Sequence, residues 1–434
     1  MKYGCSGLAL ALAAFALAAC SSSSSGGSNG SSSSSGSVDL RIGDVVPLTG
    51  PAAVFGPSWD KAARLAAADA NRAAKAAGLK LHVTISTADE GSTPQSATTA
   101  ARQLVSQGAS CILGALSSSD SIAIAKGVTI PAKVPQISPA STSVLYGNLH
   151  AEGGFTFRTI LSDAFASKLL AGYMAQALHG AKGKLVSVAG RDDSYGAPAS
   201  QAFASAWRAL GGSVEGPVLY DPNATSFDSD AALIVRSHPA AFVIFDDPGT
   251  YAEVGAALLR TASFNADKLY TTSGLPSTIA GSGIPPAALE GAHVISTGLP
   301  TSGPALKAYN SAYAASTLSP KQAQPYNEDN FDGAMLCAMA AAAAHSTAGS
   351  AIAHKLLSVV SANAPGYNYL QLDQAFAALK AGKSIDYQGP SGSTQLDSNG
   401  DPTSTTADIG VYRAGTLVTI GQLQLKDGKV LPLG

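Results

Sequence analysis

Two Ser/Thr-rich turns hold the side chains of this chain that are best suited to chemistry. Leu116-Ser117-Ser118-Ser119 and Ser138-Pro139-Ala140-Ser141-Thr142 each follow a short apolar run, about one strand–helix unit apart. The carboxyl ends of parallel strands meet at one edge of a sheet, so both turns are expected to point hydroxyls and backbone N–H groups into one crevice. Neutral donors grouped in this way predict a site for a small anion, and we expect a carboxylate.

A purely structural role for the first turn stays open. Residues 117–119 also suit the cap of a helix over residues 121–126, which is a common function of serine. The two roles are compatible, because a helix N-terminus that faces a crevice is itself a place for an anion.

Strands and helices alternate along the chain and would position these turns. Apolar periodicity predicts strands at 38–46, 81–86 and 110–113 with helices at 59–77 and 92–107 between them. The same alternation restarts after residue 158, with helices at 164–178, 197–210 and 251–261 and strands at 184–189, 213–219, 241–245 and 268–272. Alternation of this kind predicts α/β lobes with doubly wound parallel sheets. A chain of 434 residues exceeds the ~250–300 residues that one core usually serves, so we expect two lobes.

Later segments complete the prediction. We expect a strand at 293–297, helices at 304–315, 328–344, 351–361 and 370–381, and a terminal β-hairpin from 409–412 and 417–425 with Asp427-Gly428 as a turn.

The N-terminus predicts export. Lys2 precedes an apolar stretch over residues 8–19, which is too short to span a ~30 Å hydrocarbon core comfortably. Leu17-Ala18-Ala19-Cys20 resembles a bacterial lipobox, so residues 1–19 are expected to be a signal peptide and Cys20 the lipidated first residue. An ordinary cleavage site with an incidental cysteine is the alternative. Residues 20–37 are almost entirely Ser and Gly and predict a flexible tether.

Composition excludes several classes of protein. The net charge of −2, without a Lys/Arg cluster, argues against a nucleic-acid surface. No Cys/His spacing suggests a metal, and we expect no cofactor. Cys111 lies in an apolar strand and Cys337 in an Ala/Met helix, a placement that favours buried free thiols over a disulfide.

Catalytic motifs fail in context, so we do not expect an enzyme. Gly26-Gly27-Ser28-Asn29-Gly30 fits G-x-S-x-G but lies in the tether, and Ser58-Trp59-Asp60-Lys61 fits S-x-x-K without its companion K-T-G element.

Several ordered blocks resemble one known family. Ile42-Gly43-Asp44-Val45-Val46-Pro47-Leu48-Thr49-Gly50-Pro51, Pro135 through Thr142, Asp192-Asp193-Ser194-Tyr195-Gly196, and the segment 326–340 are similar to blocks of the leucine/isoleucine/valine-type periplasmic solute-binding proteins. The resemblance covers nearly all of residues 38–434. It implies a type I periplasmic-binding-protein fold, with two Rossmann-like lobes joined by three crossover strands near 155–159, 293–297 and 405–409. Lobe 1 would comprise residues 38–157 and 294–405, and lobe 2 residues 158–293 and 406–434.

The resemblance also implies a ligand, partners and a location. It places the carboxylate of an amino acid or related small acid on Ser118, Thr142 and the backbone near Ala140, with Phe55 packing on the ligand and Tyr195 reaching it from lobe 2. Delivery to an ABC permease in the inner membrane would follow, from a protein anchored by lipid at the periplasmic or extracellular face of a bacterial membrane. A ligand sensor that signals to a membrane receptor or regulator is the alternative.

The partner of a ligand ammonium group is left open. Relatives generally place an acidic residue in the loop after the strand that corresponds to 268–272, but here the loop reads Thr272-Ser273-Gly274-Leu275-Pro276. Asp246 and Asp247 follow a neighbouring strand and could supply the charge, although capping of the next helix is an equal reading. Asp120 is a third candidate, with compensation of a helix dipole as its simpler role. Without a carboxylate partner, the site would instead suit an amide, a keto acid or an aromatic acid.

Overall fold

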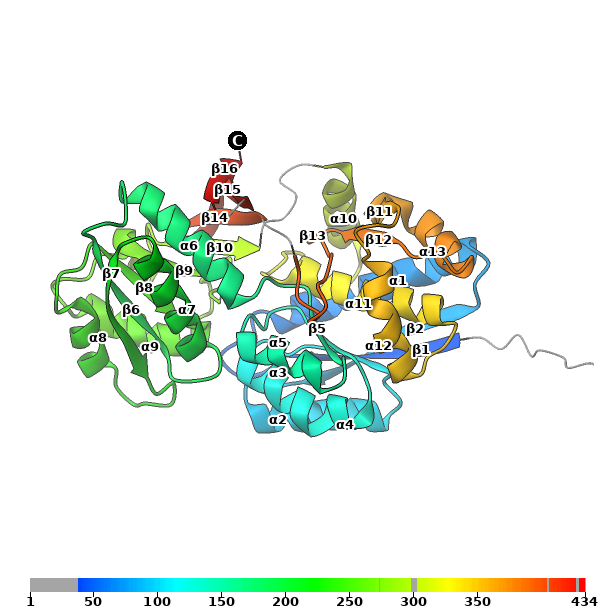
Figure 1. Cartoon of the computed structure of the whole chain (residues 1–434). Coiled ribbons are helices and arrows are strands. Elements are labelled where there is room, and N and C mark those ends of the chain that lie inside the picture. The colour runs from blue at the N-terminus through cyan, green and yellow to red at the C-terminus, as the bar shows by residue number, and fades with distance from the viewer. Residues whose placement is uncertain (1–37, 273, 298–302, 404–405, 427–428, 434) are drawn as a thin grey trace, which may run out of the picture. The chain divides into compact units, whose positions relative to one another are not determined.

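The computed structural model describes residues 38–272, 274–297, 303–403, 406–426 and 429–433. The predicted signal peptide, Cys20, the tether and the Asp427-Gly428 turn lie outside these residues. Two separate sheets organise the described chain, as the type I periplasmic-binding-protein fold requires (Figure 1).

The first sheet is parallel and belongs to the part that we call lobe 1. Its strand order is β2-β1-β3-β4-β5. The strands are β1 (Val38–Val46), β2 (Leu81–Asp89), β3 (Cys111–Leu113), β4 (Gln136–Ser138) and β5 (Thr156–Arg158). The helices between them are α1 (Gly56–Ala76), α2 (Pro94–Ser106), α3 (Ser118–Ile124), α4 (Ile130–Ala132) and α5 (Val144–Asn148).

A later segment completes lobe 1. It adds α10 (Pro304–Ala315), α11 (Asn327–Ala344), α12 (Gly349–Leu356), α13 (Leu372–Lys380) and a small sheet of β11 (Gly366–Asn368), β12 (Asp386–Gly389) and β13 (Gly392–Ser393). Helices α1 and α11 cover one face of the first sheet and α2 to α5 lie on the other (Figure 1).

The second sheet belongs to lobe 2 and has the order β16-β15-β14-β10-β9-β8-β6-β7. Its parallel strands are β6 (Leu185–Arg191), β7 (Ser213–Tyr220), β8 (Ala241–Phe245), β9 (Leu269–Thr272) and β10 (His293–Thr297). The antiparallel strands are β14 (Thr406–Arg413), β15 (Thr416–Lys426) and β16 (Lys429–Leu433). The helices are α6 (Asp163–Ala177), α7 (Gly196–Ala209), α8 (Asp228–Val235) and α9 (Pro248–Leu259).

The chain moves between the two sheets three times, after β5, after β10 and before β14. The sequence places residues 294–297 in lobe 1, whereas β10 pairs with β9 and β14 and is therefore part of the second sheet. The predicted terminal hairpin is present and gains β16 as an outer strand.

Local signals explain the helices well. Thr93 caps α2, because its side chain accepts a hydrogen bond from the Ser96 N–H, and Pro94 occupies the first turn. The buried face of α2 consists of Ala97, Ala100, Ala101 and Leu104, at the helical spacing that the sequence predicts.

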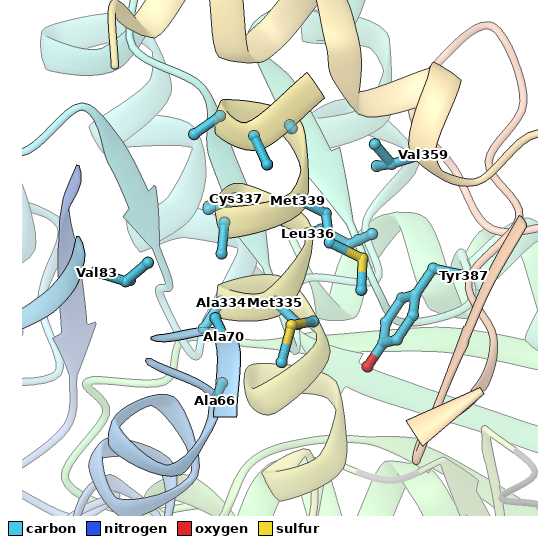
Figure 2. Close-up of a cluster of buried hydrophobic side chains, with 14 of the residues drawn as sticks. Ala66, Ala70, Val83, Ala334, Met335, Leu336, Cys337, Met339, Val359 and Tyr387 are labelled. Atoms are coloured by element: carbon cyan, nitrogen blue, oxygen red, sulfur yellow. The ribbon is translucent and has the colours of Figure 1, made fainter. Parts of the chain in front are cut away.

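Helix α11 is the centre of the lobe 1 core. All but its last two residues are buried, and its small Ala side chains let α1 pack closely against it. Figure 2 shows Ala66 and Ala70 of α1 on one side of α11, with Met339 on the side of Val359 and Tyr387.

Among the described residues no single helix is both long and apolar enough to cross a membrane, and only the bent pair of residues 327–344 and 349–359 meets the test together. Since α11 is buried in lobe 1, its apolar composition serves the core.

Cys111 and Cys337 form a disulfide, which corrects the expectation of free thiols. Cys111 lies on β3 and Cys337 on α11, and their Cα atoms are 6.2 Å apart. Because α11 packs directly on the sheet over β3, two cysteines that are 226 positions apart meet in the core.

Candidate functional site

A cavity between the two lobes brings most of the predicted site residues together. It holds about 460 Å³ of empty space, part of which opens to solvent. Its walls are Leu116, Ser117, Ser118, Ala140, Thr142 and Tyr326 from lobe 1 and Arg191, Asp193, Tyr195, Asp247, Thr272 and Gly274 from lobe 2. Most of these residues follow the carboxyl ends of parallel strands, which is the usual place for ligands in open α/β sheets.

The two Ser/Thr turns are tied to one another at the lobe 1 wall. Ser117 caps α3, because its hydroxyl accepts a hydrogen bond from the Asp120 N–H at 3.2 Å. Ser118 is 2% exposed, and its hydroxyl accepts a hydrogen bond from the Ser143 N–H at 3.3 Å. Ser117 therefore has the capping role, while the adjacent Ser118 fixes the second turn and still lines the cavity.

Thr142 has a hydroxyl that no described group satisfies. Its Oγ1 atom is buried and lies close to the Asp163 carboxyl without a hydrogen bond of good geometry. The Thr142 carbonyl in turn accepts a hydrogen bond from the Asp163 N–H at 2.7 Å. A buried hydroxyl without a hydrogen-bond partner destabilises the folded protein, so a ligand oxygen or nitrogen that bonds to this atom would be favourable.

Asp163 is a buried carboxyl that the sequence analysis missed. It is the first residue of α6 and is 1% exposed, and neither carboxylate oxygen has a hydrogen-bond partner among the described residues. Burial raises its pKa to about 7, while the Thr142 hydroxyl and the Arg158 guanidinium oppose the rise. Asp163 lines a small neighbouring cavity that shares Thr142 and Thr272 with the main one.

Arg158 holds the second turn from behind. Its guanidinium is fully buried, and Nη1 donates to the carbonyls of Ser141 and Ser143 at 2.9 and 3.0 Å. Its Nε donates to Asp401, which comes from the segment before β14. The resulting clamp fixes the backbone on both sides of Thr142.

Tyr195 lines the cavity from lobe 2, as the sequence predicts. Its hydroxyl is 3.1 Å from Oγ1 of Thr272, and its N–H donates to Asp193 at 2.9 Å. Burial raises the pKa of Tyr195 well above its usual value, so the hydroxyl stays protonated and can act as a donor.

Gly274 lies in the loop where relatives are expected to carry an acidic residue. A Cβ atom at this position would lie 2.3 Å from the Asp246 carbonyl oxygen and 3.1 Å from the Tyr195 hydroxyl. The Asp246 backbone, with the Tyr195 hydroxyl beside it, therefore leaves no room for a side chain at 274.

Arg191 and Asp193 contribute charge that the sequence analysis did not assign to the site. Arg191 ends β6, and its guanidinium forms ion pairs with Asp193, at 2.8 Å, and with Asp247. Asp247 also caps α9 by accepting from the Gly249 and Thr250 N–H groups. Its two suggested roles, site residue and cap, are thus combined in one side chain. The position of Arg191 at the carboxyl end of a buried strand was a usable signal for the site.

Asp246 does not line the cavity. It is 1% exposed and accepts hydrogen bonds from the Tyr220 hydroxyl at 2.7 Å and from the Asp247 N–H at 2.8 Å. Burial raises its pKa to about 8. It supports the strand end and is not placed to reach a ligand.

Phe55 is fully buried and does not line the cavity either. Its ring packs against Trp59 and Tyr326, with ring centres 6.1 and 6.3 Å away. Tyr326 supplies the aromatic wall that the sequence assigns to Phe55, and Phe55 acts as its support. The segment 326–340 resembles a family block, but nothing in the sequence assigned Tyr326 to the site, because it precedes α11 and lies far from the other site residues.

No group of three or more His, Cys, Asp or Glu side chains in the described ranges has the arrangement of a metal site. The lining offers hydroxyls, backbone donors and one paired arginine, which suit reversible binding of a small polar solute.

Comparison with known proteins supports this picture. Residues 39–414 match the family model described as periplasmic binding protein. The Leu/Ile/Val-binding protein homolog 3 of Brucella melitensis biotype 1 is 30% identical over 226 residues, which are 50% of this chain and 56% of that protein. The match therefore spans little more than half the length of this relative.

Solved structures share the fold at low sequence identity. The branched-chain amino acid substrate-binding protein LivJ of Streptococcus pneumoniae, in complex with isoleucine, superposes with a TM-score of 0.68 at 18% identity, covering 91% of this chain and 100% of that one. A solute-binding protein of R. palustris in complex with benzoate gives 0.66 at 18% identity, covering 88% and 96%. Since the family model matches nearly all of the described chain, this protein belongs to the periplasmic binding proteins, a family that binds solutes and does not catalyse reactions.

Proposed function

We propose that this protein captures an amino acid or a related small carboxylate between its lobes and delivers it to an ABC permease. The observation that carries the proposal is the composition of the cavity, where hydroxyls of both lobes converge on one space. Relatives with this fold were solved with isoleucine and with benzoate, so both an aliphatic amino acid and an aromatic acid fit the proposal.

The carboxylate end of the ligand would lie against Ser118, the backbone near Ala140, and Thr142. Hydrogen bonds to a charged acceptor contribute about 1.5–3 kcal/mol each, so several neutral donors can hold a carboxylate without an unpaired arginine. A hydrogen bond from the Thr142 hydroxyl would stabilise the complex most, because this hydroxyl has no other partner among the described residues.

An ammonium group would find its partner in Asp163. This carboxyl lies beside Thr142, and both of its oxygens are free among the described residues. A cation next to it would stabilise the ionised form and lower its raised pKa. Asp163 thus replaces the acidic residue that Gly274 cannot supply, and an α-amino acid remains compatible with the site.

The test compares ligands and variants by thermal shift and calorimetry. Leucine, isoleucine, benzoate, 4-hydroxybenzoate and keto acids are titrated into residues 38–434, because a ligand that binds the folded state raises its apparent stability. The double variant Ser118→Ala, Thr142→Ala is expected to abolish stabilisation by any acid that binds. The control Ser205→Ala removes an exposed hydroxyl on α7, far from the cavity, and should change nothing. Undiminished binding by the double variant would refute the site.

Export and anchoring form part of the same proposal. The apolar stretch over 8–19 and Cys20 support a lipid-anchored form at the periplasmic or extracellular face. Replacement of Cys20 by Ser should move the protein from the membrane fraction to the soluble fraction, and an unchanged distribution would contradict the anchor.

A further inference from the structure

A second, larger cavity adjoins the binding cavity. It holds about 1180 Å³ of empty space, including space that opens to solvent. Five wall residues belong to both cavities: Leu116, Ser117, Arg191, Asp193 and Asp247. The two cavities therefore share a wall, and we call the second one the outer compartment; a long ligand held at Ser118 and Thr142 would extend toward it.

The outer compartment has a strongly unbalanced charge. Six carboxyl groups line it: Glu90, Asp120, Asp192, Asp193, Asp221 and Asp247. Arg191 is the one cation among its described wall residues, and its guanidinium already pairs with Asp193 and Asp247. The lobe 1 carboxyls, Glu90 and Asp120, have no ion pair among the described residues.

Glu90 presents an oxygen that the protein does not satisfy. The residue is 1% exposed, and its Oε2 atom accepts a hydrogen bond from the Leu116 N–H at 3.0 Å. Its Oε1 atom is buried without a partner among the described residues. An unpaired buried carboxylate oxygen is costly, so a donor supplied from outside would stabilise this corner of the outer compartment.

Asp120 adds a second carboxyl to the same corner. It is 2% exposed and lies in the first turn of α3. Burial raises the pKa of Glu90 well above its usual value, and the charge of Asp120 adds to the rise. Burial raises the pKa of Asp120 to about 6, which the Ser117 hydrogen bond and Arg191 oppose and Asp193 increases. Both groups thus carry an electrostatic penalty that a cation would remove.

We propose that the outer compartment binds the cationic end of the ligand through Glu90 and Asp120, so that the preferred solute is a basic amino acid with an ammonium or guanidinium group at its far end. This inference rests on the proposed function, because it takes the carboxylate end to be held at Ser118 and Thr142. An organic cation fits better than a metal ion, since no described cluster has the arrangement of a metal site. The cation brings N–H donors for Oε1 of Glu90 and charge-assisted hydrogen bonds for both carboxylates.

The decisive comparison uses pairs of amino acids in which only one member carries a cationic group at the far end of its side chain. Lysine and norleucine, and arginine and citrulline, are titrated into residues 38–434 by calorimetry at pH 7.5 and low salt. Lysine and arginine are expected to bind at least ~10-fold tighter than their uncharged counterparts, which corresponds to about 1.4 kcal/mol. Equal affinity within either pair overturns the inference, and this result requires no variant.

Variants then locate the preference. Glu90→Gln and Asp120→Asn should each reduce lysine affinity about 10-fold while norleucine binding changes less than about 2-fold. The matched control Glu253→Gln removes an exposed carboxylate on α9, outside both cavities, and should leave both ligands unaffected. An equal loss for lysine and norleucine would indicate a structural role for the carboxyl and contradict the inference.

The outcomes also separate this inference from the proposed function. If leucine or benzoate binds through Ser118 and Thr142 and lysine has no advantage, only the cationic subsite is wrong. If no acid binds at all, the proposed function fails as well. If the double variant Ser118→Ala, Thr142→Ala does not fold, the cationic subsite is still tested by the ligand pairs with the wild type and by the single variants.

Discussion

The Nε atom of Arg158 lies 2.6 Å from Oδ1 of Asp401, although 243 positions separate the two residues. The same guanidinium donates to the carbonyls on both sides of Thr142. An acidic residue in the last segment of lobe 1 therefore orients the arginine that shapes the proposed ligand turn.

Asp401→Ala should lower both stability and ligand affinity. The Arg158 side chain is fully buried while that of Asp401 is 23% exposed, so loss of the carboxylate leaves a largely uncompensated buried charge. Breaking fully buried pairs costs about 3–5 kcal/mol, and we expect about 2–3 kcal/mol here in urea unfolding. Asp373→Ala breaks the exposed pair with Arg72 and should cost less than about 1 kcal/mol. Similar losses in the two variants would show that the clamp has no special role.

Gly249→Ala should weaken ligand binding without unfolding either lobe. Gly249 lies in the first turn of α9 in lobe 2, and a Cβ atom there would lie 2.7 Å from Cβ of Pro51 in lobe 1. The added methyl group would force the lobes apart at this contact and so reduce the contacts that both make to a ligand. We expect affinity to fall about 10-fold in calorimetry, with little change in circular dichroism. Gly303→Ala is the matched control, because nothing lies within 4 Å of a Cβ atom there. Unchanged affinity in Gly249→Ala would mean that this contact does not limit closure.

Stability should fall as the pH rises from about 4 to about 8. Burial raises the pKa of Asp246 from 3.8 to about 8, so within this range the folded state keeps a proton that the unfolded state has lost. Each such proton lowers the free energy of unfolding by up to about 1.4 kcal/mol per pH unit. Asp44 and Asp332, with pKa values raised by burial to about 7, contribute in the same direction.

The variant Asp246→Asn isolates one of these groups. Urea titrations at pH 5 and pH 8 give the free energy of unfolding at each pH. In the variant this free energy should fall less between pH 5 and pH 8 than in the wild type, by the contribution of about one bound proton, so the variant gains relative stability at pH 8. The same slope in variant and wild type would indicate that Asp246 is ionised in the folded protein.

Removal of the disulfide should destabilise lobe 1. The bond closes a long loop, with 226 positions between Cys111 and Cys337, and loss of such a constraint typically costs about 2–5 kcal/mol. The double variant Cys111→Ala, Cys337→Ala should have a lower urea midpoint than the wild type. A reducing agent should lower the midpoint of the wild type toward that of the variant and leave the midpoint of the variant unchanged. Insensitivity of the wild type to complete reduction would contradict a stabilising disulfide.

The features that could be predicted from sequence depend on local signals. The Thr93 cap, the Ala face of α2 and the turns that follow apolar strands are encoded within a few residues. The rule that strand ends share one edge then carried the prediction from those turns to a common cavity. Ser118, Ala140 and Thr142 line that cavity for this reason, whereas Tyr195 and Asp247 follow strands of the second sheet and reach it from lobe 2.

The features that could not be predicted depend on contacts between distant segments. Cys111 and Cys337 meet because α11 packs over β3, and neither residue's neighbours in sequence carry that information. Phe55 and Tyr326 show the same limit. Both are aromatic and lie close together, but only the approach of the α11 start to the cleft decides which ring reaches the cavity.

Asp163 was missed for a related reason. In the sequence it reads as an ordinary acidic residue in the first turn of a helix, which normally compensates the helix dipole. Only the crossing of the chain between the lobes reveals that its carboxyl lies beside Thr142 and away from water.

The hydrogen bond from the Asp163 N–H to the Thr142 carbonyl joins the ligand turn of lobe 1 to the first residue of α6 in lobe 2. A change in the angle between the lobes would therefore also move the Thr142 hydroxyl, as long as this hydrogen bond persists. Consider a partner that binds more tightly when the lobes are spread. Thermodynamic linkage requires that this partner lowers the affinity for the ligand, and that the ligand lowers the affinity for the partner by the same factor. Docking of such a partner would thus favour release of the proposed solute, without a displacing group that enters the cavity.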